Sequence, residues 1–471
     1  MMNRPQPTGL EISFEKRFQP YLEKFRRIGA DETIVRNFRS NFARFLAGEV
    51  DWLPEESLQP LDSLPDAETI DAETVRLGAE HIAETVIVKL NGGLGTGMGL
   101  DRAKSLLIAK DGHTFLEIIL AQVRSLGLPL VLMNSFVTHR ETLAALAVQR
   151  PANPVLAFEQ NRVPKINIAD ALPASCPERE ELEWCPPGHG DFYIAFASSG
   201  ILRRLLEQGY KYAFISNADN LGAVLHAGIL GYFIRNELDF LMETAERTPA
   251  DRKGGHLALK NDRLVLREIA QCPEADLVHF RDIQRHRFFN TNNLWLNLKS
   301  LQAQLEKNDY VFTLPLIANR KTLDPRDPST PEVIQLETAM GAAVSVFPRA
   351  QAIRVPRSRF IPVKDTNDLL IVRSDYYQLL DNYMLVPHPQ RRYPEIRAAL
   401  DPRFYKFYYD FEKRFPEGVP SLRNCRQLTV EGDVYWQADV SVEDDATVVN
   451  RSGLAQTVPR GSVIRGELIW N

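Results

Sequence analysis

The sequence predicts an α/β protein with a mixed, mostly parallel central sheet, preceded by helices and followed by a short β-helix. Three observations predict this fold. Apolar residues recur every three or four positions near the start, strand-like runs alternate with amphipathic stretches through the middle, and apolar residues recur every six positions near the end. These patterns are typical of helices, of a layered parallel sheet and of hexapeptide β-helix coils, respectively.

The composition excludes several classes of protein. The chain has 471 residues, enough for a few domains of roughly 100–200 residues each. Its 56 Lys and Arg against 61 Asp and Glu give a net charge of −5, so no nucleic acid or anionic membrane is attracted to the whole molecule. No apolar run approaches the ~20 residues of a membrane span, and no classical export signal is visible. We therefore expect a cytoplasmic protein, with four reduced cysteines and no zinc site.

The first 80 residues are expected to form a helical segment. Apolar residues spaced by three or four run from Phe14 to Phe25 and again from Ile34 to Leu46. This spacing predicts a helical hairpin that packs on another part of the protein. Residues 51–78 are acidic and contain three prolines, and we interpret them as a connector.

From Thr85 onward, strand and helix patterns alternate. We expect buried strands at Thr85–Val88, Pro129–Met133, Tyr212–Ile215 and Phe240–Met242, and amphipathic helices over 114–126, 139–149, 192–208 and 223–236. Buried strands that alternate with helices imply a mostly parallel sheet. Residues 256–269 differ, because leucines alternate on both sides of Asn261-Asp262. That pattern is typical of a β-hairpin and makes the predicted sheet a mixed one.

The tail carries two apolar rows with a period of six, formed by Leu428, Val434, Val440 and Ala446 and by Val430, Trp436, Val442 and Val448. A β-meander with period-two alternation also satisfies a period of six. The two parallel rows favour a short β-helix. Such a segment needs a neighbour to bury its face, either the main domain or a second copy of the chain.

The most informative stretch is Lys89–Lys104, KLNGGLGTGMGLDRAK, with five glycines between a predicted strand and a predicted helix. Glycines let the backbone approach a ligand closely, and successive N–H groups at a helix start can converge on an anion. The stretch therefore predicts a phosphate-binding loop. It matches neither the GxGxxG fingerprint of dinucleotide-binding domains nor the GxxxxGK[ST] pattern of P-loops.

The loop resembles the signature of sugar-1-phosphate nucleotidylyltransferases, although Ala103 replaces their usual proline. It is most similar to the eukaryotic-type UTP–glucose-1-phosphate uridylyltransferase family, whose loop reads KLNGGLGT. Further blocks resemble this family in the same order, namely LVLMNSF (130–136), PPGHGD (186–191), SNADNLGA (216–223), FNTNNLW (289–295), QLETAMGAA (335–343) and VPRSRFIPVK (355–364).

The resemblance implies a Rossmann-like nucleotidyltransferase domain over 81–400. A C-terminal domain with a helix and a short left-handed β-helix over 401–471 would follow, and it offers a surface for homo-oligomers. The implied reaction joins UTP and glucose 1-phosphate into UDP-glucose and diphosphate, reversibly, by in-line attack on the α-phosphorus. Because both reactants are polyanions, catalysis should rest on positioning and charge neutralisation by lysines and Mg²⁺.

The resemblance assigns catalytic roles to two lysines. Lys364 is implied as the main catalytic cation, and Lys104 is expected to reach the phosphates from the helix after the loop. Asp219 follows a strand, where ligands of open α/β sheets gather, and its carboxylate suits Mg²⁺ completed by phosphate oxygens and water. The implied nucleotide-binding residues are Leu90, Asn91, Gly92, Gly93, Lys104, Gln160, Gly188, Asn217, Asp219 and Lys364.

The resemblance also implies a set of sugar-binding residues, His189, Asn217, Glu268, Asn290, Asn292 and Glu337. Neutral amides suit sugar hydroxyls, and in a regular strand Asn290 and Asn292 point to the same face. Gln160 is implied to read uracil, because an amide both donates and accepts as the imide edge requires. Gly188 is implied near the same base.

Three alternatives stay open on the sequence alone. One is a UDP-sugar pyrophosphorylase of broad specificity, or a UDP-N-acetylhexosamine enzyme. Another is a non-catalytic sensor of nucleotide sugars, which would tolerate loss of Lys364 or Asp219. The third is a glycosyltransferase, which predicts a DxD-type metal motif that Asn217-Ala218-Asp219 matches only in part.

Overall fold

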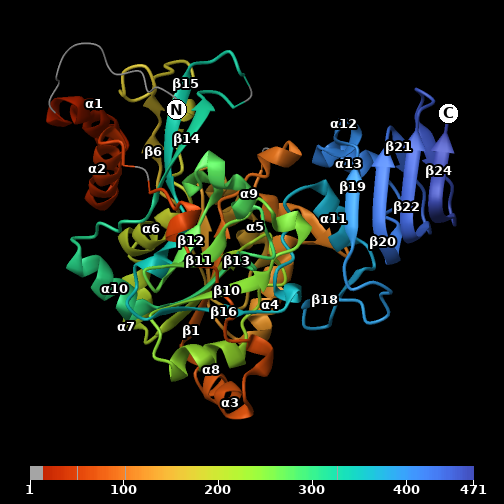
Figure 1. Cartoon of the computed structure of the whole chain (residues 1–471), viewed down its shortest axis with the longest axis horizontal. Coiled ribbons are helices and arrows are strands. Elements are labelled where there is room, and N and C mark those ends of the chain that lie inside the picture. Colours follow the sequence, from red (N-terminus) through yellow and green to blue (C-terminus); the bar gives the residue numbers. More distant parts are fainter. Residues whose placement is uncertain (1–13, 50, 101, 326) are drawn as a thin grey trace. The chain divides into compact units, whose positions relative to one another are not determined.

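The computed structural model, drawn in Figure 1, describes residues 14–49, 51–100, 102–325 and 327–471, so the first thirteen residues of the predicted helical segment lie outside it. The chain forms two compact units, each built from separate stretches. Unit 1 comprises Met1–Thr85, Phe158–Ala213 and Ala227–Arg354; unit 2 comprises Val86–Ala157, Phe214–His226 and Val355–Asn471. The predicted domain boundaries near residues 80 and 400 stay a prediction.

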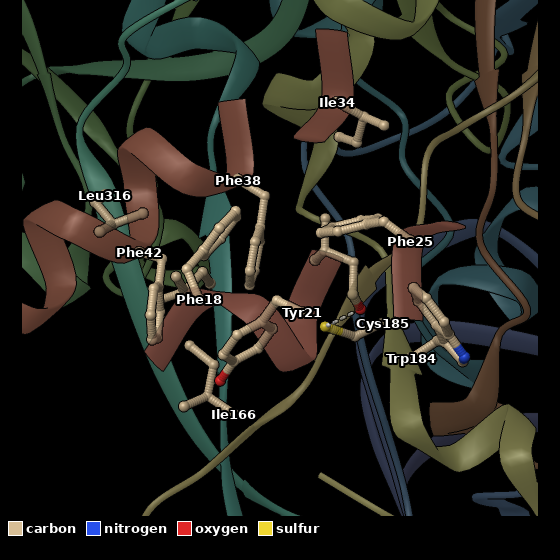
Figure 2. Packing of buried hydrophobic residues seen from close by; sticks show 12 residues of the cluster. Phe18, Tyr21, Phe25, Ile34, Phe38, Phe42, Ile166, Trp184, Cys185 and Leu316 are labelled. Atoms are coloured by element: carbon tan, nitrogen blue, oxygen red, sulfur yellow. Dashed lines mark hydrogen bonds between the residues drawn. The ribbon is translucent and has the colours of Figure 1, made fainter. Parts of the chain in front are cut away.

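The predicted helical hairpin at the start of unit 1 is confirmed. Helices α1 (Phe14–Arg27) and α2 (Glu32–Leu46) present aromatic side chains to each other, and Figure 2 shows these rings packed together. The ring of Phe18 in α1 stacks with that of Phe38 in α2, with centroids 6.2 Å apart. The cluster also takes in Ile166, Trp184 and Leu316, so the hairpin is fixed to unit 1 by a shared apolar core.

The predicted connector has more structure than its prolines and acidic residues suggested. It contains α3 (Ala72–Glu80), so the interpretation of residues 51–78 as a simple connector was wrong at this end. Helix α3 packs on α8 (Ala227–Arg235), and a Cβ at Gly78 would lie only 1.8 Å from the carbonyl oxygen of Ala227. Because this contact uses glycines instead of an apolar stripe, it left no helical period in the sequence.

The rest of the connector is anchored by contacts between charged side chains. Glu55 is buried and accepts hydrogen bonds from Arg267 at 2.7 Å and Arg285 at 2.5 Å. The ring of His286 contacts the same carboxylate at 3.1 Å. Arg267 and His286 are themselves fully buried. The paired charges offset the cost of burying each group, and they tie the connector to the strands of unit 1.

The strands of unit 2 follow the parallel pattern that the sequence predicts. Their order is β9 (Tyr212–Asn217), β1 (Thr85–Asn91), β4 (Leu130–Asn134) and β5 (Val155–Glu159), with β1 and β4 in parallel register from Ile87↔Leu130 to Asn91↔Asn134. Helices α4 (Phe115–Leu126) and α5 (His139–Gln149) lie where they were expected. A capping box between Thr114 and Glu117 starts α4.

The strands of unit 1 are mostly antiparallel. Strand β11 (His256–Lys260) pairs with β12 (Arg263–Arg267) and with β13 (Phe288–Asn297), and β10 (Phe240–Glu246) lies between β13 and the parallel strand β16 (Ala350–Arg354). Both hairpin-turn residues, Asn261 and Asp262, have positive φ, as a type I′ turn requires. The predicted hairpin and mixed sheet are thus confirmed.

One predicted helix is divided. Residues 192–208 form α6 (Phe192–Ser198) and α7 (Ile201–Glu207), separated at Gly200 with φ +76°. The remaining elements before the tail are β2 (Ile108–Lys110), β3 (His113–Thr114), β6 (Val163–Pro164), β7 (Ile166–Asn167), β8 (Trp184–Cys185), α9 (Leu277–Phe280), α10 (Leu298–Lys307), β14 (Leu316–Thr322), β15 (Glu332–Thr338), α11 (Thr366–Arg373), β17 (Tyr377–Leu379) and β18 (Leu385–Pro387).

The tail of unit 2 is a β-helix built from parallel strands. Strands β19 (Arg397–Leu400), β20 (Ser421–Glu431), β22 (Ser441–Asn450) and β24 (Val463–Trp470) lie side by side, as the blue strands of Figure 1 show, and β21 (Val434–Trp436) pairs with β23 (Gln456–Val458). Helices α12 (Pro402–Tyr405) and α13 (Tyr408–Arg414) precede β20.

The register of the tail explains its apolar rows. Leu428 pairs with Ala446 and Val430 with Val448, so one coil spans 446 − 428 = 18 residues, or three periods of six. The strands are parallel, which excludes the β-meander.

Among the described residues, no helix has the length and apolar character needed to cross a membrane. The four cysteines are free thiols, and burial raises the pKa of Cys185 and Cys425 to about 12.

Candidate active site

The glycine loop after β1 adopts short turns where a helix was predicted. Its described residues form two 3₁₀ turns, Thr96–Met98 and Lys104–Leu106, so the expectation of a helix start beneath the loop was wrong. Gly95 and Gly99 have φ near +70°, a left-handed conformation that interrupts helical winding. No described atom lies within 4 Å of where a Cβ of Gly93 or Gly97 would be. An anion at this loop would therefore meet open backbone rather than a helix terminus.

Lys104 and Asp219 form an ion pair in unit 2. Asp219 follows the end of β9, and its Oδ2 accepts a hydrogen bond from the Lys104 ammonium at 2.8 Å. The other oxygen, Oδ1, is buried and accepts no hydrogen bond within the described chain. A buried carboxylate oxygen without a donor is costly unless a cation meets it.

The segment that carries Lys364 is tied to Asp219. The backbone N–H of Val363 donates to the carbonyl oxygen of Asp219 at 3.1 Å. Asn220 holds the same segment, because its amide donates to Arg359 and its Oδ1 accepts from Ile361. Asn220 is not among the predicted site residues, although it lies in the block SNADNLGA.

Lys364 itself has an exposed side chain at the end of this segment. Its ammonium lies over the Phe360 ring, 5.8 Å from the centroid, and its backbone N–H donates to Asp368 at the start of α11. A Cβ at Gly222 would lie 2.4 Å from the carbonyl oxygen of Ser358, so the two segments approach as closely as their backbones allow. We call Lys104, Asp219 and Lys364 the lysine–aspartate cluster.

Leu90 and Asn91, at the end of β1, make hydrogen bonds beneath the glycine loop. The side-chain amide of Asn91 donates to Asn134 at 2.7 Å and to Thr142 at 3.0 Å, and the carbonyl oxygen of Leu90 accepts from Ala218. Asn91 is 4% exposed. Its amide therefore fixes β1, β4 and α5 to each other beneath Gly92 and Gly93. Asn217 ends β9, and its carbonyl oxygen accepts from Asn220.

Gln160 and Gly188 meet in unit 1. The Gln160 amide donates to the carbonyl oxygen of Gly188 at 2.6 Å, which leaves its oxygen and one N–H for another partner. A Cβ at Gly188, which has φ +78°, would lie 2.4 Å from the carbonyl oxygen of Thr338. The loop is also held by Asp191, whose carboxylate accepts two hydrogen bonds from Asn161 and whose pKa burial raises to about 6. Asp191 and Asn161 are not among the predicted site residues.

His189 is held as a neutral donor. Its Nδ1 accepts a hydrogen bond from the Met340 backbone at 3.0 Å, which assigns the ring proton to Nε2. The ring remains accessible to solvent, yet the surrounding protein disfavours the imidazolium and lowers the pKa of His189 to about 4. His189 can therefore donate from Nε2 to an acceptor such as a phosphate or hydroxyl oxygen.

Two of the predicted sugar-binding residues, Glu268 and Asn290, lie against Gly255 and Gly341 of unit 1. Asn290 donates its backbone N–H to Gly255, and a Cβ at Gly255 would lie 2.6 Å from the Glu268 carboxylate. Gly341 similarly makes room for the Asn290 amide. Glu337 packs beside Gly188, and burial raises its pKa. We use the name amide cluster for the predicted base- and sugar-binding residues of unit 1, which are Gln160, Gly188, His189, Glu268, Asn290, Asn292 and Glu337.

Asn290 and Asn292 do not lie on a regular strand. Glu243 of β10 pairs with Asn293, but the next residue, Thr244, pairs with Asn290, so β13 carries two extra residues at this point. Asn292 has φ +59°, and its backbone N–H donates to the side-chain oxygen of Asn290 at 2.8 Å. The expectation that strand alternation aims both amides at one face was therefore wrong. A bulge sets their directions instead.

Comparison with known proteins places this geometry in a family. The family model described as UTP--glucose-1-phosphate uridylyltransferase matches residues 35–443. Similar proteins carry the same description: one from Solanum tuberosum is 37% identical over 92% of each chain, and one from Hordeum vulgare is 38% identical over 91% of this chain and 92% of its own.

Solved structures agree with these matches. A point mutant of UDP-glucose pyrophosphorylase from Leishmania major, in complex with UDP-glucose, is 40% identical with a TM-score of 0.88, covering 96% of this chain and 98% of its own. A UDP-glucose phosphorylase from Trypanosoma brucei is 41% identical with a TM-score of 0.87, covering 97% of this chain and all of its own.

Proposed function

The chain belongs to the UTP–glucose-1-phosphate uridylyltransferase family, and from this premise we propose how its residues perform the reaction. The enzyme converts UTP and glucose 1-phosphate into UDP-glucose and diphosphate. In the proposed mechanism an oxygen of the sugar phosphate attacks the α-phosphorus of UTP in line. A new P–O bond forms, the bond to the bridging oxygen breaks, and diphosphate leaves with the electron pair. The same steps run in reverse.

The lysine–aspartate cluster is proposed to bind the phosphates. Two anions must approach each other, so fixed positive charge lowers the barrier most where negative charge develops. Lys364 is assigned to the transferring phosphate and Lys104 to the phosphates of UTP. The observation that carries this assignment is that both are fixed on Asp219, Lys104 through its ammonium and the Lys364 segment through Val363. Gly92 and Gly93 add backbone donors, on a base held by Leu90 and Asn91.

We infer Mg²⁺ as the cofactor and Asp219 as its protein ligand. The support is the buried Oδ1 of Asp219, which has no hydrogen-bond donor in the described chain. No group of three or more acidic, His or Cys side chains that could hold a metal is found among the described residues, so phosphate oxygens and waters would complete the shell, as Mg²⁺ prefers. When bound, the ion would supply charge neutralisation to the phosphates.

The amide cluster is proposed to read the base and the sugar. Gln160 and Gly188 are assigned to uracil, because the Gln160 amide keeps an oxygen and an N–H free to match the imide edge. His189 is assigned to the sugar phosphate through its Nε2 proton. The hydroxyls of glucose are assigned to Glu268, Asn290, Asn292 and Glu337. Asn217 is assigned to both nucleotide and sugar, as the resemblance implies.

Two further assignments rest on the sequence and on surface features. We keep the cytoplasm as the proposed location, with no nucleic-acid or membrane partner. Assembly of copies through the C-terminal domain is also proposed, because β24 is the outer strand of its sheet and exposes Val463 and Ile469. Unpaired outer strands are ready templates for pairing with another chain.

Sugar specificity is tested by diphosphate release from UTP and Mg²⁺ with glucose, galactose and N-acetylglucosamine 1-phosphates. We expect release with glucose 1-phosphate at least about tenfold faster than with either other sugar, since a site that hydrogen-bonds each hydroxyl penalises a misplaced one. Comparable rates across the panel would contradict glucose specificity and favour a broad UDP-sugar enzyme. Binding of UTP without release would contradict the catalytic assignment and favour the sensor.

A further inference from the structure

Glu243 of β10 is a fully buried carboxylate beside the bulge that carries Asn290 and Asn292. Its Oε2 accepts a hydrogen bond from the Asn293 side-chain amide at 3.0 Å, and its Oε1 accepts one from the Trp295 indole at 2.9 Å. Asn293 and Trp295 are also fully buried. The two oxygens therefore bond β13 at two points, at Asn293 on the edge of the bulge and at Trp295 beyond it.

The backbone of Glu243 holds the bulge as well. The hydroxyl of Thr291 donates to the carbonyl oxygen of Glu243 at 2.7 Å, and it accepts the Asn293 backbone N–H at 3.3 Å. Thr291 is 1% exposed. A bulge interrupts the ladder of the sheet, and its unpaired backbone needs other partners. Here the backbone N–H groups of Asn292 and Asn293 donate to the side chains of Asn290 and Thr291, and Glu243 in turn accepts from the Thr291 hydroxyl.

We propose that Glu243 is a positioning residue for the sugar, acting through Asn293 and Thr291 on the directions of Asn290 and Asn292. The inference rests on the proposed function, which assigns these two amides to glucose hydroxyls. An ionised carboxylate has only acceptors, and both of its oxygens here face donors. In Glu243→Gln one oxygen becomes an NH₂ group. Facing the Trp295 indole it loses that hydrogen bond, and facing Asn293 it requires the Asn293 amide to turn over, so we expect the bulge to shift.

A second constraint confines the same amide. A Cβ at Gly341 would lie 2.8 Å from the Asn290 amide nitrogen and 2.9 Å from a methyl group of Leu266. Asn290 therefore has little room to adjust when the bulge moves. A small shift at Glu243 would therefore move the Asn290 amide, which is assigned to the sugar.

The test measures kcat, the KM for each substrate and thermal unfolding for four variants. We expect Glu243→Gln and Asn293→Ala to raise the KM for glucose 1-phosphate about tenfold, as loss of one charge-assisted hydrogen bond implies, with the KM for UTP nearly unchanged. Trp295→Phe is the matched control: it removes the bond beyond the bulge, so it should lower the unfolding temperature without raising the KM for the sugar.

The reference variant is Asn290→Ala, which should raise the KM for glucose 1-phosphate directly. If it does so while Glu243→Gln and Asn293→Ala leave that KM unchanged, the positioning role of Glu243 is wrong. The same holds if Trp295→Phe raises the sugar KM as much as Glu243→Gln does. If Asn290→Ala itself has no effect on that KM, the proposed sugar role of Asn290 fails instead.

Discussion

At the scale of single residues, Asp219 contacts Lys104 through its side chain and the segment of Lys364 through its backbone. Its Oδ2 holds the Lys104 ammonium, and its carbonyl oxygen holds the backbone that leads to Lys364. Its remaining oxygen is buried without a donor from the described chain. We infer that this oxygen is kept for a cation, since burying an ionised oxygen without a partner is expensive.

This inference predicts the behaviour of Asp219→Asn. The amide keeps the size of the side chain but removes the charge, so we expect kcat to fall about 100-fold and the Mg²⁺ concentration for half-maximal rate to rise at least about tenfold. The rise in unfolding temperature when Mg²⁺ and UTP are added should also be smaller in this variant. The exposed Asp381→Asn serves as control. An unchanged Mg²⁺ requirement in Asp219→Asn would contradict the role of Asp219.

The sequence singled out these residues as a predicted site, but it did not reveal their surroundings. Asp219 could be placed because it follows an apolar strand, and Lys104 and Lys364 because their blocks resemble one family. The bulge at Asn292 could not be predicted, because it is set by Glu243, some fifty residues away in the chain. The side-chain amide of Asn91 bonds Asn134 and Thr142 inside the protein, and these partners are also distant in the chain, so this contact could not be predicted either.

At the scale of elements, the contact between α3 and α8 shows how glycine shapes unit 1. A Cβ at Gly231 would lie 1.8 Å from the carbonyl oxygen of Thr74 and 3.0 Å from the backbone nitrogen of Gly78. The two helices therefore touch backbone to backbone at this point. Any side chain there would force them apart.

Gly231→Ala is expected to destabilise unit 1 despite the better helix propensity of alanine. Overpacking against backbone costs about 1–3 kcal/mol, more than the gain of about 1 kcal/mol from replacing glycine in a helix. Chemical unfolding should show a lower midpoint, with kcat unchanged. Glu80→Ala, on an exposed face of α3, should alter stability by less than about 0.5 kcal/mol. Equal stability of Gly231→Ala and the wild type would contradict the close contact.

Local chemistry decided which elements the sequence could predict. The hairpin at Asn261 and Asp262 was predictable because its turn requires positive φ at both residues, which Asn and Asp tolerate. Helix α3 was missed because its contact is made by glycines and its Val75 is exposed. The helix expected after the glycine loop fails because left-handed glycines interrupt the chain there.

At the scale of the whole molecule, each compact unit is assembled from three separate stretches of chain. No pattern within one stretch reveals which other stretches it will join, so this division lay beyond sequence reasoning. The tail was predictable because the coil from β20 to β22 repeats after 18 residues at Leu428 and Val430, which leaves the period of six in the sequence.

The central claim is that the lysine–aspartate cluster catalyses uridylyl transfer, and the most direct test compares kcat in Lys364→Ala and Arg357→Ala. Both side chains are cations over the Phe360 ring, at 5.8 Å and 5.3 Å from its centroid, so the two variants remove similar charge and packing. We predict that UDP-glucose formation falls about 1,000-fold in Lys364→Ala and stays within about threefold of wild type in Arg357→Ala. Near-normal turnover in Lys364→Ala, or an equal loss in both variants, would contradict the claim.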